Sequence, residues 1–386
     1  MNRENIVSRG QKTSALLTCS PGRVFLTCAI IMLFLTGACT HLEKPSSIVN
    51  TSEVYLDWGK NPPDAFDRAR HAITGKRPFE WWYFDGHLDT GETFVGVFLD
   101  PSFTTGKPGV AFSLYSADWK KETYLRTFRD EEMFSSTEDV LVECPVGHVH
   151  RIDENTYDVL WDMGEVRAEF TLTTLAPGWR PRGADGVNED HLDFFWAVHQ
   201  ARNRIEGTLT RQGKTTHVTG VGYSDHNWGK KPLPEITRDW IWGRIIVGDY
   251  TIIYADVDYL DPSIDSRPLY IAKGDTVLVG TGSPDVIQWD FSTHPTLKRH
   301  YPQRIRIEFF QEGVEARFDI TFKELVEEVD LLTVSGLNPV VQWVARTFVA
   351  RPTYFRVIAD FQGTVRAQGI NDTLSGECLY EVMGFE

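Results

Sequence analysis

The chain has 386 residues, with 39 Lys and Arg against 54 Asp and Glu, which gives a formal net charge of −15. A protein that binds a phosphate backbone needs a basic surface, and no run of Lys or Arg supplies one, which argues against nucleic acid as a partner. A hydrophobic fraction of 41% excludes a disordered chain. The length fits two domains, and an aromatic fraction of 12% favours a β protein or an aromatic-lined pocket.

The first 38 residues are typical of an export signal. Residues 1–23 hold four basic residues and one acidic residue, a net charge of +3. The apolar run that follows, 24–35, is too short for a membrane span of about 20 residues and matches the apolar core of a secretory signal. Small residues at 36–38 then precede Cys39.

This arrangement resembles a bacterial lipoprotein signal, in which the cysteine becomes the lipidated first residue, although Leu35 stands one position further from Cys39 than is usual. We therefore expect an exported protein that a lipid on Cys39 anchors to the cell-envelope membrane, on the outer membrane or the periplasmic side if the cell is Gram-negative. The alternative is an ordinary cleaved signal peptide or a membrane stub, with Cys39 incidental.

The cysteines beyond the signal give no disulfide framework. Removal of 1–38 leaves Cys39, Cys144 and Cys378. With Cys39 lipidated, only one pair remains, and whether Cys144 and Cys378 meet is left open. No Cys-x-x-Cys is present, so redox and zinc-ribbon interpretations have no support.

Residues 39–75 are expected to be a tether and lead-in, with one or two helical turns within 65–74. From Phe79 onwards the pattern is one of strands and turns. Apolar and polar residues alternate with a period of two, as in half-buried strands, along 166–172, 305–309 and 314–322. Short turns predict hairpins within 205–219 and 305–322, and a third around the tight turn at 247–250 between two apolar strands.

Few helices are expected, the best being 338–348, which has Pro339 near its start. This pattern predicts an all-β protein of β-barrel or β-sandwich units. A charged, proline-broken stretch at 230–234 is the natural boundary. We therefore expect an N-terminal domain at 76–233 and a C-terminal domain at 234–386.

Three segments concentrate aromatic and polar residues: Glu80–Gly86 (EWWYFDG), Gly220–Gly229 (GVGYSDHNWG) and Asp239–Arg244 (DWIWGR). Polar side chains inside an aromatic wall are either paired or chemically active. Burial of the Asp225 carboxyl beside aromatic rings raises its pKa, which suits a general acid at neutral pH. Aromatic faces can also stabilise a developing carbocation. Together these features suit protonation of an alkene, followed by water addition or ring closure.

The predicted catalytic residues are Asp225, His226 and Tyr223. The predicted substrate-binding residues are Glu80, Trp82, Trp196, Asn227, Trp228, Trp240, Trp242 and Arg244. If the third segment is a strand, Trp240, Trp242 and Arg244 share one face. A purely structural interpretation stands beside this one, in which Asp225 caps a turn, His226 is a satisfied core histidine and the tryptophans form the core.

Other patterns are weaker. His148 and His150 place two imidazoles on one strand face, a metal-binding geometry, but the sequence shows no third ligand. Asp256 and Asp258 form an acidic pair of a kind common on solvated surfaces. The sequence lacks the motifs of serine hydrolases, zincins and nucleotide-binding loops. We therefore expect neither a metal nor a cofactor.

These segments resemble the family that contains carotenoid 1,2-hydratase (hydroxyneurosporene synthase) and the AttH-like secreted proteins. The family's Glu-Trp-Trp-Tyr start is at Glu80–Tyr83, and its Gly-Tyr-x-Asp-His-Asn-Trp-Gly block is at Gly222–Gly229. The lead-in at 201–209 and the closing GECLYEVMGF at 376–385 are also similar, so the likeness extends over about 79–386.

The resemblance implies two lipocalin-like β domains side by side, with a hydrophobic pocket within or between them. It also implies chemistry on greasy substrates without a redox cofactor: hydration of polyene ends, or ring closure as in fungal pericyclases. The proton donor proposed for the hydratases corresponds to Asp225, and the motif tyrosine to Tyr223. The sequence departs from the hydratases where they have a His two residues before a Trp: Phe194 precedes Trp196 here, and the nearest His is His199.

Two classes of function remain. In the first, the chain is a cofactor-free hydro-lyase or isomerase that acts on an isoprenoid- or polyketide-like substrate, with Asp225 as proton donor. In the second, it is a lipid-binding or carrier lipoprotein without turnover, and the same aromatics line its pocket. The resemblance favours the first, and the export signal favours the second.

Overall fold

The structure is a computed structural model that describes residues 62–71, 73–102, 105–181, 193–282, 284–311, 313–333, 351–367 and 369–385. The predicted signal 1–38, Cys39, most of the tether and the helix predicted at 338–348 lie outside these residues.

Eleven antiparallel strands form the first sheet, in the order β4-β3-β2-β1-β11-β10-β9-β8-β7-β6-β5. Their bounds are β1 Phe79–Leu88, β2 Thr93–Leu99, β3 Gly109–Tyr115, β4 Lys121–Thr127, β5 Phe134–Ser135, β6 Leu141–Cys144, β7 Gly147–Arg151, β8 Thr156–Asp162, β9 Val166–Ala176, β10 Phe194–Arg211 and β11 Lys214–Gly229.

Nine antiparallel strands form the second sheet, in the order β15-β14-β13-β12-β20-β19-β18-β17-β16. Their bounds are β12 Thr237–Val247, β13 Tyr250–Tyr259, β14 Pro268–Lys273, β15 Thr276–Gly282, β16 Asp285–Thr293, β17 His300–Gln311, β18 Val314–Asp330, β19 Thr353–Ala367 and β20 Ile370–Gly384. The all-β prediction is confirmed, as are the three predicted hairpins.

The described helices are short: α2 Ala65–Arg68, η2 Asp130–Glu132 and η4 Leu233–Glu235. The helical turn predicted within 65–74 is the single turn α2, which begins where the Asp64 carboxylate accepts a hydrogen bond from the backbone N–H of Asp67. None of the helices in the described part of the chain has the length and apolar character needed to span a bilayer.

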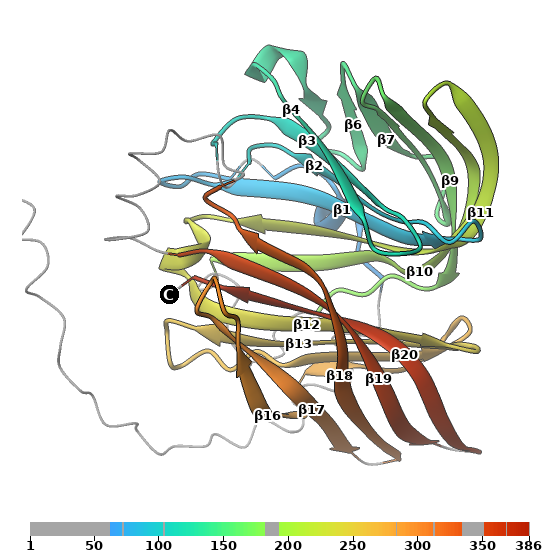
Figure 1. The fold of residues 1–386 in the computed structure, drawn as a ribbon, viewed down its shortest axis with the longest axis vertical. Helices are drawn as coiled ribbons and strands as arrows, with labels where there is room; N and C mark the ends of the chain where they lie inside the picture. The colour runs from blue at the N-terminus through green and yellow to red at the C-terminus, as the bar shows by residue number, and fades with distance from the viewer. Residues whose placement is uncertain are drawn as a thin grey trace, which may run out of the picture. The chain divides into compact units, whose positions relative to one another are not determined.

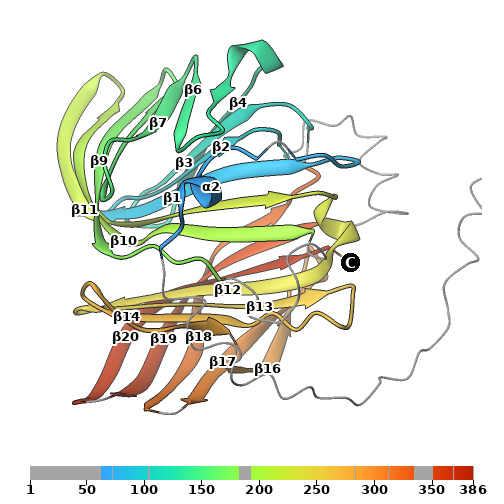
Figure 2. The same cartoon turned by 180° about the vertical axis from the view of Figure 1, so that it is seen from behind.

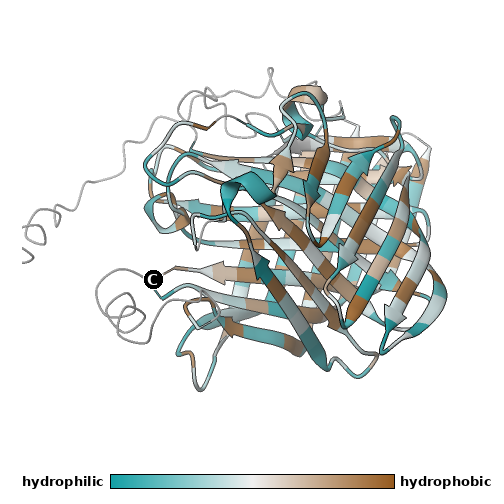
Figure 3. Cartoon of the chain, turned by 90° about the horizontal axis from the view of Figure 1, so that it is seen from above, coloured by the Kyte–Doolittle hydropathy of each residue, from teal (hydrophilic) through white to brown (hydrophobic). Residues whose placement is uncertain are grey.

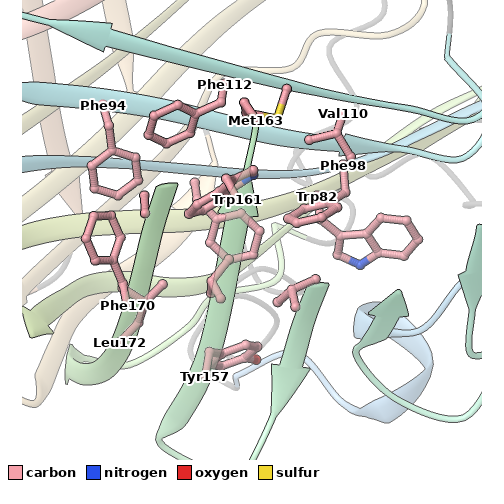
Figure 4. Close-up of a cluster of buried hydrophobic side chains, with 14 of the residues drawn as sticks. Trp82, Phe94, Phe98, Val110, Phe112, Tyr157, Trp161, Met163, Phe170 and Leu172 are labelled. Atoms are coloured by element: carbon pink, nitrogen blue, oxygen red, sulfur yellow. The ribbon is translucent and has the colours of Figure 1, made fainter. Parts of the chain in front are cut away.

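The first sheet is curled (Figures 1 and 2). Its inward-facing side chains pack together in one buried core. Hydrophobic and polar bands alternate along the strands in Figure 3, which is the period of two expected for strands with one buried face. Trp161 of β8 lies at the centre of this core, with its ring centroid 5.8 Å from Phe94 and 5.6 Å from Phe98, both on β2. Figure 4 shows this aromatic cluster.

The second sheet has its own aliphatic core. Ile252 of β13 and Ile271 of β14 belong to one buried cluster with Ile305 and Ile307 of β17, although β12, β20, β19 and β18 lie between these strands in the sheet. The second sheet is therefore also curled, as Figure 1 shows.

A third cluster lies between the two sheets. It combines Trp179 and Tyr223 with Trp242 of β12 and with Ile253 and Tyr270 of the neighbouring strands. Strands β1, β10 and β11 of the first sheet therefore have two buried faces, one toward their own core and one toward the second sheet. Such strands carry apolar residues on both sides, which explains why EWWYF lacks a polar alternation.

The pairing left open for the cysteines is resolved. Cys144 lies on β6 and Cys378 on β20, and both are free thiols.

The aromatic core predicts a packing test at Gly96. A methyl group added there would lie 2.3 Å from the Trp161 ring. We expect Gly96→Ala to lower the free energy of unfolding in urea by about 1–3 kcal/mol. In a Trp161→Leu background, where the indole is gone, the same alanine should cost much less. An equal cost in both backgrounds would contradict this explanation.

Candidate active site

Strand β11 carries the most polar of the three segments, and its pleat divides that segment between two environments. All residues from Gly222 to Gly229 are buried. Because successive side chains of a strand point to opposite faces, Tyr223, Asp225 and Asn227 share one face, and His226 and Trp228 the other. The predicted catalytic residues therefore do not form one cluster.

The Asp225 face is directed toward the second sheet. Tyr83 of β1 and Val198 of β10 are the register partners of Asp225, and Tyr223 packs in the cluster between the sheets. On the opposite side, Trp242 projects from β12 with its ring centroid 5.3 Å from that of Tyr223. The acid thus lies among aromatic rings contributed by both sheets.

Asp225 is held by three donors. Tyr223 donates its hydroxyl to Oδ2 at 2.7 Å, and Trp196 donates its indole N–H to the same oxygen at 3.0 Å. Asn227 donates its amide to Oδ1 at 2.8 Å. Burial raises the pKa of Asp225 to about 7 because the loss of water around the carboxylate outweighs these hydrogen bonds, and the charge of Asp85 adds to the rise.

An ion cluster adjoins the acid. The Asp85 carboxylate of β1 lies 2.7 Å from Arg244 of β12 and 3.3 Å from Arg356 of β19. Arg356 also lies 3.6 Å from Glu381 of β20, whose pKa burial raises. These contacts join the two sheets through buried charges, each of which has an opposite partner, as burial requires.

The Arg244 guanidinium extends this cluster toward Asp225. It lies over the Tyr223 ring, 5.0 Å from the centroid, and 5.9 Å from that of Trp242. One of its terminal nitrogens, Nη1, is buried and has no hydrogen-bond partner in the described structure. This nitrogen is a ready donor to an oxygen of a bound molecule.

The opposite face of β11 holds a second polar cluster, formed by His226, Glu80 of β1 and His71 of the lead-in. Glu80 Oε1 lies 2.9 Å from His226 Nε2 and 3.0 Å from His71 Nδ1, and it accepts the backbone N–H of His71 at 2.9 Å. Trp82 stacks on the His226 ring at 4.6 Å, and Trp228 stacks on the His71 ring at 3.9 Å.

Hydrogen-bond geometry indicates where the protons of this cluster lie. The carbonyl oxygen of Asp67 only accepts, so His226 donates to it from Nδ1, at 2.9 Å. Burial lowers the pKa of His226 to about 3, so the ring is neutral and Nε2 holds a lone pair. Glu80 therefore donates to Nε2 as a protonated carboxyl, in agreement with burial raising its pKa to about 7. The cluster fastens the lead-in to β1 and β11.

These residues have metal-site spacing, with one donor atom of each lying within 4.8 Å of the others. The atoms that face one another, Glu80 Oε1, His226 Nε2 and His71 Nδ1, are engaged by the hydrogen bonds described above, whereas Glu80 Oε2 and His71 Nε2 have no hydrogen-bond partner in the described structure. We therefore interpret the cluster as a polar fastening inside the core.

The structure brings some of the predicted site residues together around Asp225 and places the others elsewhere. The residues around the acid are Tyr223, Asp225, Asn227, Trp196, Trp242 and Arg244. The residues on the other face are Glu80, Trp82, His226 and Trp228. Trp240 packs against Phe194 at 5.8 Å and Phe385 at 5.5 Å, toward the end of the second sheet.

Phe194 stands where the hydratases have a His, and His199 is the nearest His in the sequence. Neither residue supplies a polar partner to Asp225. Phe194 packs against Trp240 and Phe79. His199 is buried with its ring 5.8 Å from Tyr157 and 5.6 Å from His226, on the core side of the first sheet. Burial holds its pKa well below the ordinary value, so its ring is neutral.

Sequence reasoning missed three functional residues. Arg356 and Glu381 lie on strands more than 100 residues after Asp225 in the sequence, and no local motif marks them. His71 lies in the segment expected to be a lead-in. Asp85 lies in the EWWYFDG segment but is not among the predicted site residues, and the structure makes it the centre of the ion cluster.

No family model matches the chain. It is 29% identical over 97 residues to the quinolone epoxide rearrangement protein PenF of Penicillium thymicola, which covers 24% of this chain and 26% of that protein. It is 20% identical over 251 residues to AsqO of Emericella nidulans, also a quinolone epoxide rearrangement protein, over 54% of this chain and 62% of that protein. It is 21% identical over 234 residues to hydroxyneurosporene dehydrogenase of Chlorobaculum tepidum (50% and 59%). The matches span less than two thirds of each of these relatives.

Solved structures match almost the whole described chain. An AttH protein of Nitrosomonas europaea aligns with a TM-score of 0.57 at 16% identity, over 84% of this chain and 98% of that one. CghA in complex with Sch210972 aligns with a TM-score of 0.56 at 11% identity, over 85% and 98%. The chain has the AttH-like fold. Kievitone hydratase of Nectria haematococca aligns with a TM-score of 0.50 at 13% identity, over 84% and 97%. The resemblance seen in the sequence motifs is therefore confirmed for the lipocalin-like fold.

The Glu80 cluster predicts a pH dependence of stability. The pKa of Glu80 is about 7 in the fold against 4.5 for a free side chain. The folded state therefore holds a proton that the unfolded state has lost between these values, and stability falls as pH rises through this window. The full effect is about 3 kcal/mol for one such group.

We expect Glu80→Gln to remove this part of the slope in urea unfolding measured between pH 4.5 and 8. Glu131→Gln, at a largely exposed glutamate, is the matched control and should keep the wild-type slope. An unchanged slope in Glu80→Gln would mean that Glu80 is ionised in the fold.

Proposed function

We propose that the chain is an enzyme that hydrates, isomerises or cyclises a hydrophobic, isoprenoid- or polyketide-like substrate by acid catalysis without a cofactor, with Asp225 as the proton donor. The observation that carries this proposal is a buried carboxyl among aromatic rings with its pKa raised to about 7. A group with this pKa holds a proton in much of the population at neutral pH and is acidic enough to release it.

The hydrogen bonds assign the acidic proton to one oxygen. Oδ2 of Asp225 already accepts from Tyr223 and Trp196, which uses both of its lone pairs. Oδ1 accepts only from Asn227 and keeps one position free. The protonated form therefore carries its proton on Oδ1. Asp225 keeps 7% of its surface exposed.

The surroundings suit a cationic transition state on a substrate that also carries an oxygen. The Tyr223 and Trp242 rings offer π faces to positive charge. The positive charge of Arg244 is offset by Asp85 at 2.7 Å, which reduces its repulsion of such a cation. Its unpartnered Nη1 would donate to a carbonyl or hydroxyl oxygen of the substrate.

The comparisons support this class of chemistry. Similar proteins include a quinolone epoxide rearrangement protein, a kievitone hydratase and a Diels–Alderase. Their names describe reactions that rearrange, add water to or cyclise an organic substrate. Because identity is low and the match to the curated relatives is partial, the activity of this chain is a proposal that rests on its own site.

The test compares wild-type protein with Asp225→Asn, both purified from the native host. Asparagine keeps the size and the accepting oxygen but has no acidic proton, so we expect turnover to fall by about 10²–10⁴-fold. Mass spectrometry should find a molecule in the variant that is an isomer of the wild-type ligand or lighter by one water. That molecule is then the assay substrate. Asp89→Asn, at an exposed aspartate, is the control.

The same ligand in both proteins, with no conversion by the wild type, would sink the catalytic proposal. It would favour the second candidate, a carrier that binds a hydrophobic ligand without turnover. A variant that fails to fold would be recognised by its circular dichroism, and Tyr223→Phe then provides the independent test.

The pH profile tests the role of Tyr223. Because the protonated form of Asp225 acts, turnover should be constant below a pH of about 7 and fall above it. The Tyr223 hydroxyl stabilises the carboxylate, and Tyr223→Phe removes this hydrogen bond. The alkaline limb should therefore move to higher pH in Tyr223→Phe. A limb that stays in place would contradict the assignment of Asp225 to this ionisation.

We also propose that the chain is exported and anchored through a lipid on Cys39, a position outside the described residues. The motif at 24–39 supports this proposal. Cells grown with labelled palmitate should label the wild type and Cys19→Ala, but not Cys39→Ser, which should move to the soluble fraction. Labelling of Cys39→Ser would contradict the anchor.

A further inference from the structure

Two groups of histidines and acids in the described part of the chain have metal-site spacing. One is the buried cluster around Glu80. The other, His148, His150 and Asp158, lies on the first sheet and takes no part in the proposed chemistry. The sequence indicated the two histidines but no third ligand, and the tertiary structure supplies one.

Strand β7 presents both imidazoles on one face. Val149 lies between them in the sequence and is fully buried in the first core. Because side chains alternate along a strand, His148 and His150 point away from that core. Their rings stack at 4.3 Å with 18° between the planes, and their side chains are 26% and 28% exposed. Both side chains are therefore partly open to solvent.

The neighbouring strands add a carboxylate on each side. The register places Glu143 of β6 opposite His148, and Asp158 of β8 opposite His150. Each acid reaches diagonally to the other histidine. Asp158 Oδ2 lies 2.8 Å from His148 Nε2, and Glu143 Oε1 lies 3.2 Å from His150 Nε2. Three adjacent strands thus converge on one point.

One donor atom in this group is unsatisfied. His150 Nε2 is buried and makes no hydrogen bond in the described structure, even though Glu143 is near. The donor atoms of His148, His150 and Asp158 all lie within 4.8 Å of one another. A tetrahedral zinc ion with bonds of about 2.0–2.1 Å separates its donors by about 3.3 Å, so small side-chain rotations bring these atoms into place.

We propose that His148, His150 and Asp158, with Glu143 as the fourth ligand, form a binding site for a zinc-class divalent cation on the outer face of the first sheet. Two neutral imidazoles and carboxylate oxygens are ligands that borderline cations such as Zn²⁺ prefer over Ca²⁺ or Mg²⁺. The ion would link β6, β7 and β8, which are separated from β11 by β9 and β10. Its role is to stabilise this part of the sheet, apart from the chemistry at Asp225.

The test uses the full chain in detergent after removal of metals with a chelator. Added Co²⁺ should give visible d–d absorption that saturates at one equivalent and is abolished by one equivalent of Zn²⁺. Zn²⁺ should also raise the midpoint of thermal unfolding. His148→Gln and His150→Gln should each weaken Co²⁺ binding by at least about tenfold and remove the thermal shift.

Two variants serve as controls. His217→Gln, at an exposed histidine of β11, should bind Co²⁺ like the wild type. His71→Gln alters the buried cluster and should leave the absorption unchanged. Loss of the signal in His71→Gln, with retention in both His148→Gln and His150→Gln, would overturn the proposal. Weak binding that all variants share would also overturn it, because it would come from scattered surface groups.

Discussion

The site depends on strand β11 being buried on both of its faces. From Gly222 to Gly229 no residue reaches the surface to any large extent, yet the stretch contains Asp225, His226 and Asn227. Burying these groups is unfavourable unless each finds a hydrogen-bond partner. The hydrogen-bond partners differ between the two faces. On one face His226 takes part in a polar fastening, and on the other Asp225 is the candidate acid.

Glu80 and Asp225 are both carboxyls whose pKa burial raises to about 7. The proton of Glu80 is engaged in a hydrogen bond to His226, inside a cluster that also holds His71 and the lead-in. Asp225 differs, since its Oδ1 has a free position and the residue keeps 7% exposure. The paired strands β1 and β11 therefore carry one carboxyl that fastens the fold and one carboxyl with a free hydrogen-bonding position.

The surroundings of Asp225 are built from both sheets. Trp196 and Tyr223 come from the first sheet, Trp242 and Arg244 from the second, and Asp85 joins the sheets through Arg244 and Arg356. Related structures share this fold at 11–16% identity. At such low identity the shared fold does not identify a substrate, which has to be argued from the side chains of the site.

The sequence by itself determined the β class and the hairpins, because these depend on a local period of two and on short turns that are present in the residue order. It also indicated Asp225 and Tyr223, since polar residues within an aromatic block are conspicuous. It placed His226 with them, which was a reasonable expectation for adjacent residues. The pleat of a strand buried on both sides sends His226 to the opposite face, toward Glu80 and His71.

Only the tertiary structure decided which distant groups complete each cluster. Arg356 meets Asp85 because the two curled sheets pack against each other, and Glu381 pairs with Arg356 from the adjacent strand. Asp158 reaches His148 diagonally because the register of β7 and β8 places it opposite His150. Such contacts depend on pairing and packing over long sequence separations, and residue spacing along the chain contains no record of them.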